Sequence, residues 1–324
     1  MFKEAREGNL FSDKLVLVTD VTEKVSSKNQ SMVFCTVTVR DSSSALPFTV
    51  FKTTKQALKE KGVYPGRLLR LIRAAVGSYQ GNLQLNDVTY SFSEGDPFDY
   101  LPALTARELE HYKHVYDTIV LQSTGVGSHW RSLLEMFKEK YFEQFCRATA
   151  AVGNHSAYVG GLLVHSISVA KIAVAISKSL KERESLVATA ALLHDIGKIN
   201  TITAAGGFKM SPVGAAVEHV AEGVFIVREL IGAVRAKGVD FPQTDQVDLE
   251  HLIASHPGKL EYGALKEPAI PEAFTLSHAD MRAYEKEVYE EGTKNVDPGE
   301  SVYIRGLARY VYVPHPDIME KNGY

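Results

Sequence analysis

The stretch Ala191-Leu-Leu-His-Asp-Ile-Gly-Lys-Ile199 decides the fold of the second half of this chain. Its apolar run ends in an imidazole and a carboxylate side by side, His194 and Asp195. Burying a histidine beside an ionised aspartate is costly unless a positive charge compensates. A divalent metal ion supplies that charge, because it accepts nitrogen and oxygen ligands together. The stretch therefore predicts a buried metal site at the end of an apolar helix.

Further candidate ligands stand at wide spacing along the chain: His165, His219, His256 and Asp280. With the dyad, His165 and Asp280 would hold one ion. The other two histidines and the second oxygen of Asp195 would hold a neighbouring ion. Nitrogen and oxygen ligands without thiolate favour manganese, iron, cobalt or zinc over calcium or magnesium. A single histidine on an apolar helix is usually a hydrogen-bonded core residue, so the prediction depends on all six residues together.

Paired ions activate water and steady the charge on a phosphoryl group, so we expect phosphoryl chemistry with Asp195 bridging the ions. Lys198 follows the turn at Gly197, where it could neutralise a phosphate oxygen. The alternative is a cation that interacts with the helix dipole. His155 is a candidate substrate contact, although a surface histidine is the more common outcome.

Composition bounds the class of protein. The chain has 324 residues, 45% hydrophobic and 23% charged, which is typical of a soluble globular protein with two domains. The N-terminus is charged and shows no signal-peptide core. Polar residues interrupt the apolar run 162–176, so we expect no membrane span and no membrane partner. Cys35 and Cys146 form no disulfide or metal pattern, which favours a reducing cytoplasm.

The first 95 residues differ from the rest in charge and in periodicity. They hold 13 Lys and Arg against 9 Asp and Glu, while the remainder holds 23 against 30. Alternation over 32–40 places Val33, Cys35, Val37 and Val39 on one face of a strand. Strands are predicted over 14–21, 32–40, 45–51, 67–76 and 82–90, with a helix over 53–61. That order is typical of an OB-fold barrel, with an SH3-like barrel as the alternative.

The remainder is predicted to be helical. Thr105 and Glu108 form a capping box, Gly197 ends a helix over 186–196, and Ser211-Pro212 opens a helix that carries His219 toward residue 234. We predict four parts: an OB-fold nucleic-acid-binding domain (1–95), a linker and connecting helix (96–128), a metal phosphohydrolase domain (129–295) and a C-terminal tail (296–324). The tail holds three tyrosines and has no assigned role; it could pack on the barrel or on another subunit of a homo-oligomer.

The order and spacing of His165, His194-Asp195 and Asp280 resemble the HD-domain superfamily of metal-dependent phosphohydrolases, and His219 and His256 resemble its two-metal branch. An OB-like barrel ahead of an HD domain resembles the YhaM-type family of 3′-5′ exoribonucleases. The resemblance covers nearly the whole chain. It implies a multidomain fold, with an N-terminal all-β OB-fold barrel followed by an all-α HD domain. It also implies a two-metal phosphodiesterase of the manganese type that degrades single-stranded RNA, with single-stranded DNA as a further substrate.

An OB barrel binds single strands through aromatic platforms and a basic groove. Phe34 and Arg40 share the outer face of the second strand, so Phe34 is the first stacking candidate, ahead of Phe51 and Tyr79. Core packing is the alternative for each ring. The candidate phosphate contacts are Lys24, Lys28, Lys52, Arg70 and Arg73.

Two other functions compete with the exonuclease. One is hydrolysis of a small nucleotide such as a cyclic dinucleotide, an alarmone or a dNTP, which would need no basic barrel. The other is a nucleic-acid-binding protein whose HD domain is only structural. Six polar groups buried at a cost argue against the latter.

Overall fold

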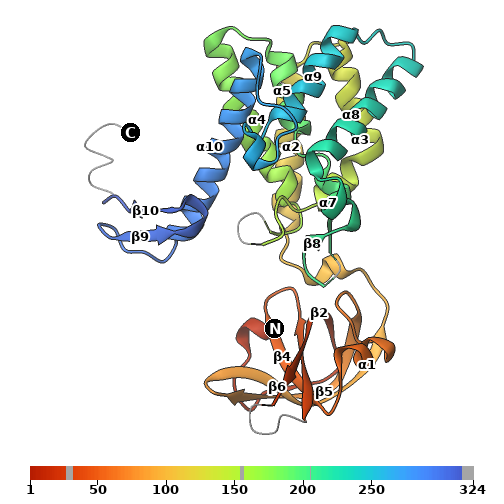
Figure 1. The fold of residues 1–324 in the computed structure, drawn as a ribbon, viewed down its shortest axis with the longest axis vertical. Coiled ribbons are helices and arrows are strands. Elements are labelled where there is room, and N and C mark those ends of the chain that lie inside the picture. Colours follow the sequence, from red (N-terminus) through yellow and green to blue (C-terminus); the bar gives the residue numbers. More distant parts are fainter. Residues whose placement is uncertain (27–31, 154–156, 205, 316–324) are drawn as a thin grey trace.

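The structure is a computed structural model that describes residues 1–26, 32–153, 157–204 and 206–315. A strand-rich N-terminal body stands below a helical body in Figure 1, and a short connection joins them. The predicted order, an all-β domain followed by an all-α domain, is confirmed.

Five long strands build the N-terminal barrel, with α1 (Lys55–Glu60) between the third and the fourth. They are β2 (Lys14–Val25), β3 (Val33–Arg40), β4 (Ala45–Phe51), β5 (Leu68–Tyr79) and β6 (Asn82–Ser93). Their pairings run β2–β3–β4–β6–β5 and return to β2; β4 and β6 pair in parallel, and the other pairs are antiparallel. Short β1 (Leu10–Phe11) extends β5. This ring has the strand order of an OB fold.

The alternation predicted on β3 is present. Cys35, Val37 and Val39 are fully buried and pack with Phe48 and Leu85 from the neighbouring strands. Their neighbours in the sequence point outward, so the barrel keeps an apolar interior and a polar, partly aromatic outer surface.

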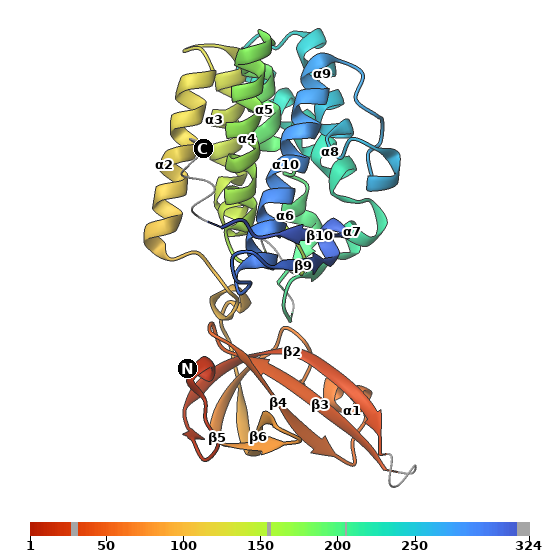
Figure 2. The same ribbon diagram turned by 90° about the vertical axis from the view of Figure 1, so that its left-hand side faces the viewer.

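The helical body surrounds α4, which packs against α2, α3, α5 and α10 (Figure 2). Its main helices are α2 (Ala106–Ser123), α3 (His129–Arg147), α4 (Gly161–Leu180), α5 (Glu184–Leu193), α8 (His219–Ala236), α9 (Gln243–Ser255) and α10 (Pro271–Thr293). Its shorter elements are η2 (Pro97–Tyr100), α6 (Lys198–Thr201), β7 (Ile202–Thr203), β8 (Lys209–Met210), α7 (Pro212–Ala216) and η3 (Leu260–Tyr262). The capping box of Thr105 and Glu108 opens α2 as predicted.

Two predicted helix boundaries are wrong. The helix opened by Ser211 ends at Ala216, and α8 begins separately at His219, because Glu218 adopts a φ of 72° that no helix accepts. Helix α5 ends at Leu193, so the His194-Asp195 dyad lies in the turn beyond it. Gly197 keeps a helical φ of −59° and is therefore not a left-handed cap.

Helix α4 also corrects the expectation that no segment has the length of a membrane span. By length and hydropathy alone, Gly161–Leu180 is apolar enough to cross a membrane. More than half of it is nevertheless buried inside the helical body, where Leu162, Leu163 and Ile167 belong to the core. Its apolar composition is therefore explained by its central position in the bundle.

The two bodies share a small apolar cluster. Leu17 and Leu68 of the barrel pack against Ala204 and Phe208, which lie in the β7–β8 hairpin. Because this hairpin connects the segment carrying Lys198 with the one carrying His219, the barrel contacts the same chain segment that builds the predicted metal site.

The predicted C-terminal tail is partly structured. Residues 301–312 form β9 (Ser301–Ile304), η4 (Arg305–Leu307) and β10 (Arg309–Tyr312). Buried Ile304 lies against Gly292 of α10, so this hairpin packs on the helix that carries Asp280.

A candidate metal centre in the helical domain

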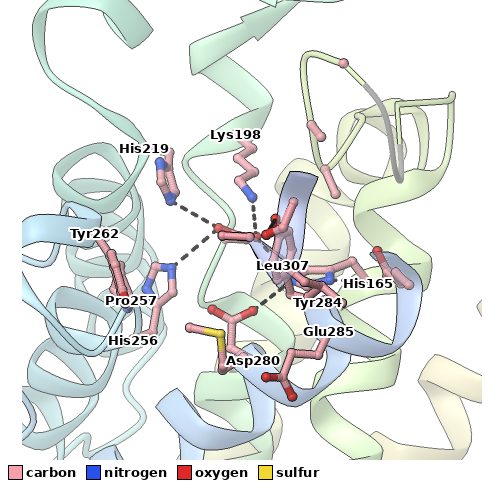
Figure 3. A pocket seen from close by; sticks show the side chains of 18 of the residues that line it. His165, Lys198, His219, His256, Pro257, Tyr262, Asp280, Tyr284, Glu285 and Leu307 are labelled. Carbon is pink, nitrogen blue, oxygen red and sulfur yellow. Dashed lines mark hydrogen bonds and ion pairs between the residues drawn. The ribbon is translucent and has the colours of Figure 1, made fainter. Parts of the chain in front are cut away.

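The structure brings the six predicted ligands together from five segments. The set comprises His165 on α4, His194 and Asp195 after α5, His219 at the start of α8, His256 directly after α9, and Asp280 on α10. Figure 3 shows His165, His219, His256 and Asp280 pointing toward one centre.

Asp195 occupies the middle of the cluster. Its Oδ2 lies 3.3 Å from His194 Nε2 and 3.6 Å from His165 Nε2. Its Oδ1 lies 3.4 Å from His219 Nε2 and 3.6 Å from His256 Nε2. Asp280 Oδ1 joins the first pair, 3.1 Å from His165 Nε2 and 3.8 Å from His194 Nε2. Each carboxylate oxygen of Asp195 therefore faces its own pair of imidazoles.

The ring orientations leave the four Nε2 atoms available as ligands. Nδ1 of His194 lies 2.8 Å from the Ala191 carbonyl oxygen, and Nδ1 of His256 lies 2.7 Å from that of Ile253. A carbonyl oxygen only accepts, so each Nδ1 carries the proton and the neutral ring keeps its lone pair on Nε2.

In the other two rings, Nδ1 faces a carboxylate oxygen instead of a carbonyl oxygen. Glu218 Oε2 lies 2.7 Å from Nδ1 of His219, and Glu287 Oε1 lies 3.4 Å from Nδ1 of His165. Such partners behind a ligating histidine orient the ring and make it more basic.

The donor set fits a divalent metal ion. His194 is 0% exposed, Asp195 2% and His256 3%. Within the described residues, neither Nε2 of His194 nor Oδ1 of Asp195 has a hydrogen-bond partner, which is costly for buried polar atoms. Two sets of three residues bring ligand atoms within 4.8 Å of one another: His165, His194 and Asp280, and His194, Asp195 and His256. Nitrogen and oxygen donors without sulfur suit manganese, iron, cobalt or zinc.

The charges around Asp195 hold it ionised. Burial alone would raise its pKa, but the Lys198 ammonium and His194 hold that pKa well below its usual range. Lys198 Nζ lies 2.6 Å from Asp195 Oδ2. Burial likewise opposes the charge on His165, yet hydrogen bonds to Asp280 and Glu287 raise its pKa to about 10. The cluster thus attracts positive charge.

A cavity of about 830 Å³ opens onto this cluster. Tyr262 lines it on the side of His256, and Tyr284 and Leu307 line it on the side of His165 (Figure 3). The tyrosines, like Glu218 and Glu287, were missed in the sequence. They carry no spacing signal, and only the packing of η3, α8 and α10 around the cluster brings them to the site.

The predicted barrel contacts are only partly brought together. Lys24, Phe34 and Phe51 are paired across β2, β3 and β4, and the two phenyl rings are 6.0 Å apart. Phe51 is exposed and Phe34 half-buried. Arg40 stands at the opposite end of β3, about 20 Å away at ~3.3 Å per residue, and its Nε donates to the Asp41 carbonyl. His155 lies outside the described residues.

The remaining basic and aromatic candidates are scattered. Exposed Tyr79 ends β5, and Arg70 is paired with Asp13 at 2.6 Å. Lys52 follows Phe51 directly, so it belongs to the same end of the barrel as the phenyl pair. Lys28 lies outside the described residues.

Comparison with known proteins agrees with this geometry. A family model described as "HD domain" matches residues 162–284. The 3′-5′ exoribonuclease YhaM of Geobacillus sp. (strain WCH70) is 23% identical over 294 residues, which span 89% of this chain and 86% of that protein. The YhaM of Oceanobacillus iheyensis is 23% identical over 294 residues, 89% of this chain and 88% of that protein. The YhaM of Bacillus subtilis (strain 168) is 29% identical over 163 residues, half of each chain.

The matched HD domain spans all six clustered residues, and the longer matches extend into the barrel. Residues 162–284 therefore carry an HD domain, and over most of its length the chain is similar to 3′-5′ exoribonucleases of the YhaM type.

Proposed function

We propose that the chain is a 3′-5′ exoribonuclease that uses two divalent metal ions, manganese foremost, and degrades single-stranded RNA, with single-stranded DNA as a second substrate. The observation that carries the proposal is Asp195, whose two carboxylate oxygens each face a separate pair of imidazole nitrogens. The relatives that match along most of the chain are named 3′-5′ exoribonucleases, which supports this choice among phosphohydrolases.

The chain's own residues would prepare the site for phosphodiester cleavage. His165, His194, Asp280 and Asp195 Oδ2 would hold one ion, and His219, His256 and Asp195 Oδ1 the other. Bound divalent ions lower the pKa of water and stabilise charge on a phosphoryl group. Lys198 balances Asp195 and faces the cavity, where its ammonium can pair with a phosphate oxygen of the substrate.

The barrel would supply the grip on the strand. Phe34 and Phe51 form an aromatic patch on its outer surface, with Lys24 and Lys52 beside it. Stacked bases and neutralised phosphates are how OB folds hold single strands without reading their sequence.

The test uses purified protein loaded with Mn²⁺ and a single-stranded RNA labelled at its 5′ end. We expect a ladder of products that shortens from the 3′ end, and strong inhibition by a 3′-terminal phosphorothioate. Phe34→Ala should weaken strand binding by about 1–3 kcal/mol. Ile72→Ala, an exposed apolar residue on β5, is the matched control and should bind normally. Release of the 5′ label as a mononucleotide at the start of the reaction would contradict the proposed polarity.

A second candidate function is hydrolysis of a small nucleotide. The observation that favours it is the lining of the cavity, which includes no barrel residue among the described ones and has the size of a small-molecule site. A panel of cyclic dinucleotides, alarmones and dNTPs separates the two. If one of these nucleotides is hydrolysed with a kcat/KM far above that for the RNA, small-nucleotide hydrolysis replaces the exonuclease proposal.

Deleting the barrel would be a poor test. Leu17 and Leu68 cover Phe208 and Ala204 of the helical body, so removal of residues 1–95 would expose an apolar surface and confuse lost binding with lost folding.

A further inference from the structure

The C-terminal hairpin, β9 and β10 with the turn between them, forms one wall of the metal cavity. Gly306, Leu307 and Ala308 of the turn and Arg309, the first residue of β10, line the same cavity as Asp195 and Asp280. The hairpin also lies at the end of α10 that is nearer the barrel (Figures 1 and 2). The hairpin therefore lines the cavity on the side of the helical body that faces the barrel.

Three contacts attach the hairpin to α10. Ile304 is buried against Gly292, Tyr284 Oη donates to the Gly306 carbonyl oxygen at 3.1 Å, and Tyr289 Oη donates to the Tyr312 carbonyl oxygen at 2.9 Å. Because Asp280 belongs to the same helix, the hairpin is held in a defined position relative to the predicted ligands. A surface on it can thus place a substrate relative to the site.

The face that points away from α10 carries an aromatic pair. Tyr303 and Tyr310 are cross-strand partners with ring centroids 5.3 Å apart, 52% and 75% exposed. Tyr312 follows on the same face by the two-residue alternation of a strand. The opposite face, with Ile304, packs on α10. These rings contribute little to the core, and clustered exposed aromatic rings mark an interaction surface.

Two arginines add positive charge here: Arg309 lines the cavity, and Arg305 begins the turn. Arg305 and Arg309 are exposed, and in the part of the chain that the structure describes neither is paired with a carboxylate. Arg309 Nε donates to the Leu307 carbonyl oxygen at 3.0 Å, which keeps the side chain at the turn. Arg309 is the cross-strand partner of Ile304, so it belongs to the face toward α10 and the cavity, opposite the rings. Exposed rings on the outer face and a guanidinium group at the cavity suit a ligand with bases and phosphates.

We propose that the hairpin binds the single strand just before it enters the metal cavity, with Tyr303 and Tyr310 stacking on bases and Arg309 facing a phosphate. This inference rests on the proposed nuclease function and names the part of the substrate that the hairpin holds. The continuity of the turn with the cavity and its positive charge favour a nucleic acid over a second copy of the chain.

The test compares wild-type protein loaded with Mn²⁺ with the Tyr303→Ala/Tyr310→Ala double variant. Binding is measured by fluorescence anisotropy with a 12-nucleotide single-stranded RNA protected by 3′ phosphorothioates. We expect the Kd to rise by about ten- to a hundredfold. The ratio of kcat/KM for the unprotected 12-mer to that for a dinucleotide should fall, because the dinucleotide is too short to reach the pair. Tyr303→Phe/Tyr310→Phe keeps the rings and should bind nearly as wild type.

Phe274→Ala is the matched control, since Phe274 is an exposed ring at the opposite end of α10. Wild-type affinity in the double alanine variant, or a change of assembly in sedimentation velocity that accounts for the loss, would overturn the proposal. The second result would make the hairpin a subunit contact. If the wild-type protein neither binds nor degrades a single strand, the proposed function and the hairpin proposal are both wrong. If the wild type degrades single strands and the double alanine variant binds and degrades them equally well, only the hairpin proposal is wrong.

Discussion

Gly197 and His219 meet so closely that a Cβ atom on Gly197 would lie 2.0 Å from the His219 carbonyl oxygen. The turn that follows the His194-Asp195 dyad thereby touches the first residue of α8. Gly223, one turn further along α8, lies against the same turn, because a Cβ atom on Gly197 would also lie 2.7 Å from the Gly223 backbone nitrogen. The glycine therefore brings His219 within reach of Asp195, a role that its position after an apolar helix did not reveal.

Gly197→Ala should displace the start of α8 and with it His219. The clash is with backbone, so side chains cannot relieve it, and we expect a loss of about 1–3 kcal/mol of stability. Binding of the second metal ion should weaken while the first is retained, measured by Mn²⁺ titration. Gly232→Ala, on the same helix, is the control. A Cβ atom at Gly232 meets nothing within 4 Å, so this substitution should leave the stability unchanged or increase it. Two tightly bound ions in Gly197→Ala would show that this contact does not position His219.

Glu218→Ala should also weaken binding of the second metal ion, because it removes the carboxylate beside the His219 ring. Glu218 accepts from the backbone N–H of His219 at 3.1 Å, and its Oε2 is 2.7 Å from the ring Nδ1. Losing such a partner typically lowers metal affinity about 10–100-fold. Glu218→Gln keeps an acceptor and should lose less. Isothermal titration with Mn²⁺ gives both affinities, and equal values for wild type and Glu218→Ala would remove Glu218 from the site.

The ionised side chain of Asp41 should stabilise the barrel. This buried carboxylate accepts from the N–H of Phe2 at 2.8 Å, from the Ser43 hydroxyl at 2.6 Å, and from Lys14 at 2.9 Å. Burial opposes its charge, but these partners hold the pKa of Asp41 well below its ordinary value. A depressed folded-state pKa contributes stability above the unfolded pKa, about 4, and this is lost as the pH falls toward the folded value.

Asp41→Asn should therefore destabilise the barrel by about 2–3 kcal/mol at pH 7. The gap between the variant and wild type should narrow as the pH falls below about 4. Urea unfolding at several pH values measures it, with the exposed Asp87→Asn as control. A gap that stays constant down to pH 2 would mean that packing, rather than charge, explains the effect of the substitution.

Removal of metal should lower the melting temperature of the helical domain. The ion would satisfy His194 Nε2 and Asp195 Oδ1, and a ligand that binds only the folded state stabilises it by mass action. We expect chelation to lower the melting temperature of wild type and to leave that of Asp195→Asn unchanged. Identical wild-type melting curves with and without chelator would count against a buried metal site.

The sequence predicted those features that depend on local pattern. Alternation located β3 and its core residues, and the high cost of burying His194 beside Asp195 singled out a site whose six members the structure brings together. Features that depend on which helices lie side by side escaped prediction. Glu287, 122 positions further along the chain, lies beside the ring of His165. Glu218, whose φ of 72° interrupts the predicted helix, lies beside the ring of His219. The packing of the C-terminal hairpin on α10 could not be predicted, because tyrosines in a sequence are equally compatible with many kinds of contact.

The most direct test of the two-metal account is a Mn²⁺ titration of metal-stripped wild type, His219→Ala and Asp195→Ala, followed by metal analysis after dialysis. We predict two ions per chain for wild type, one for His219→Ala, and none for Asp195→Ala, because both ions depend on Asp195. Folding of each variant is checked by circular dichroism. Two ions per chain in folded Asp195→Ala would contradict the central role of this carboxylate.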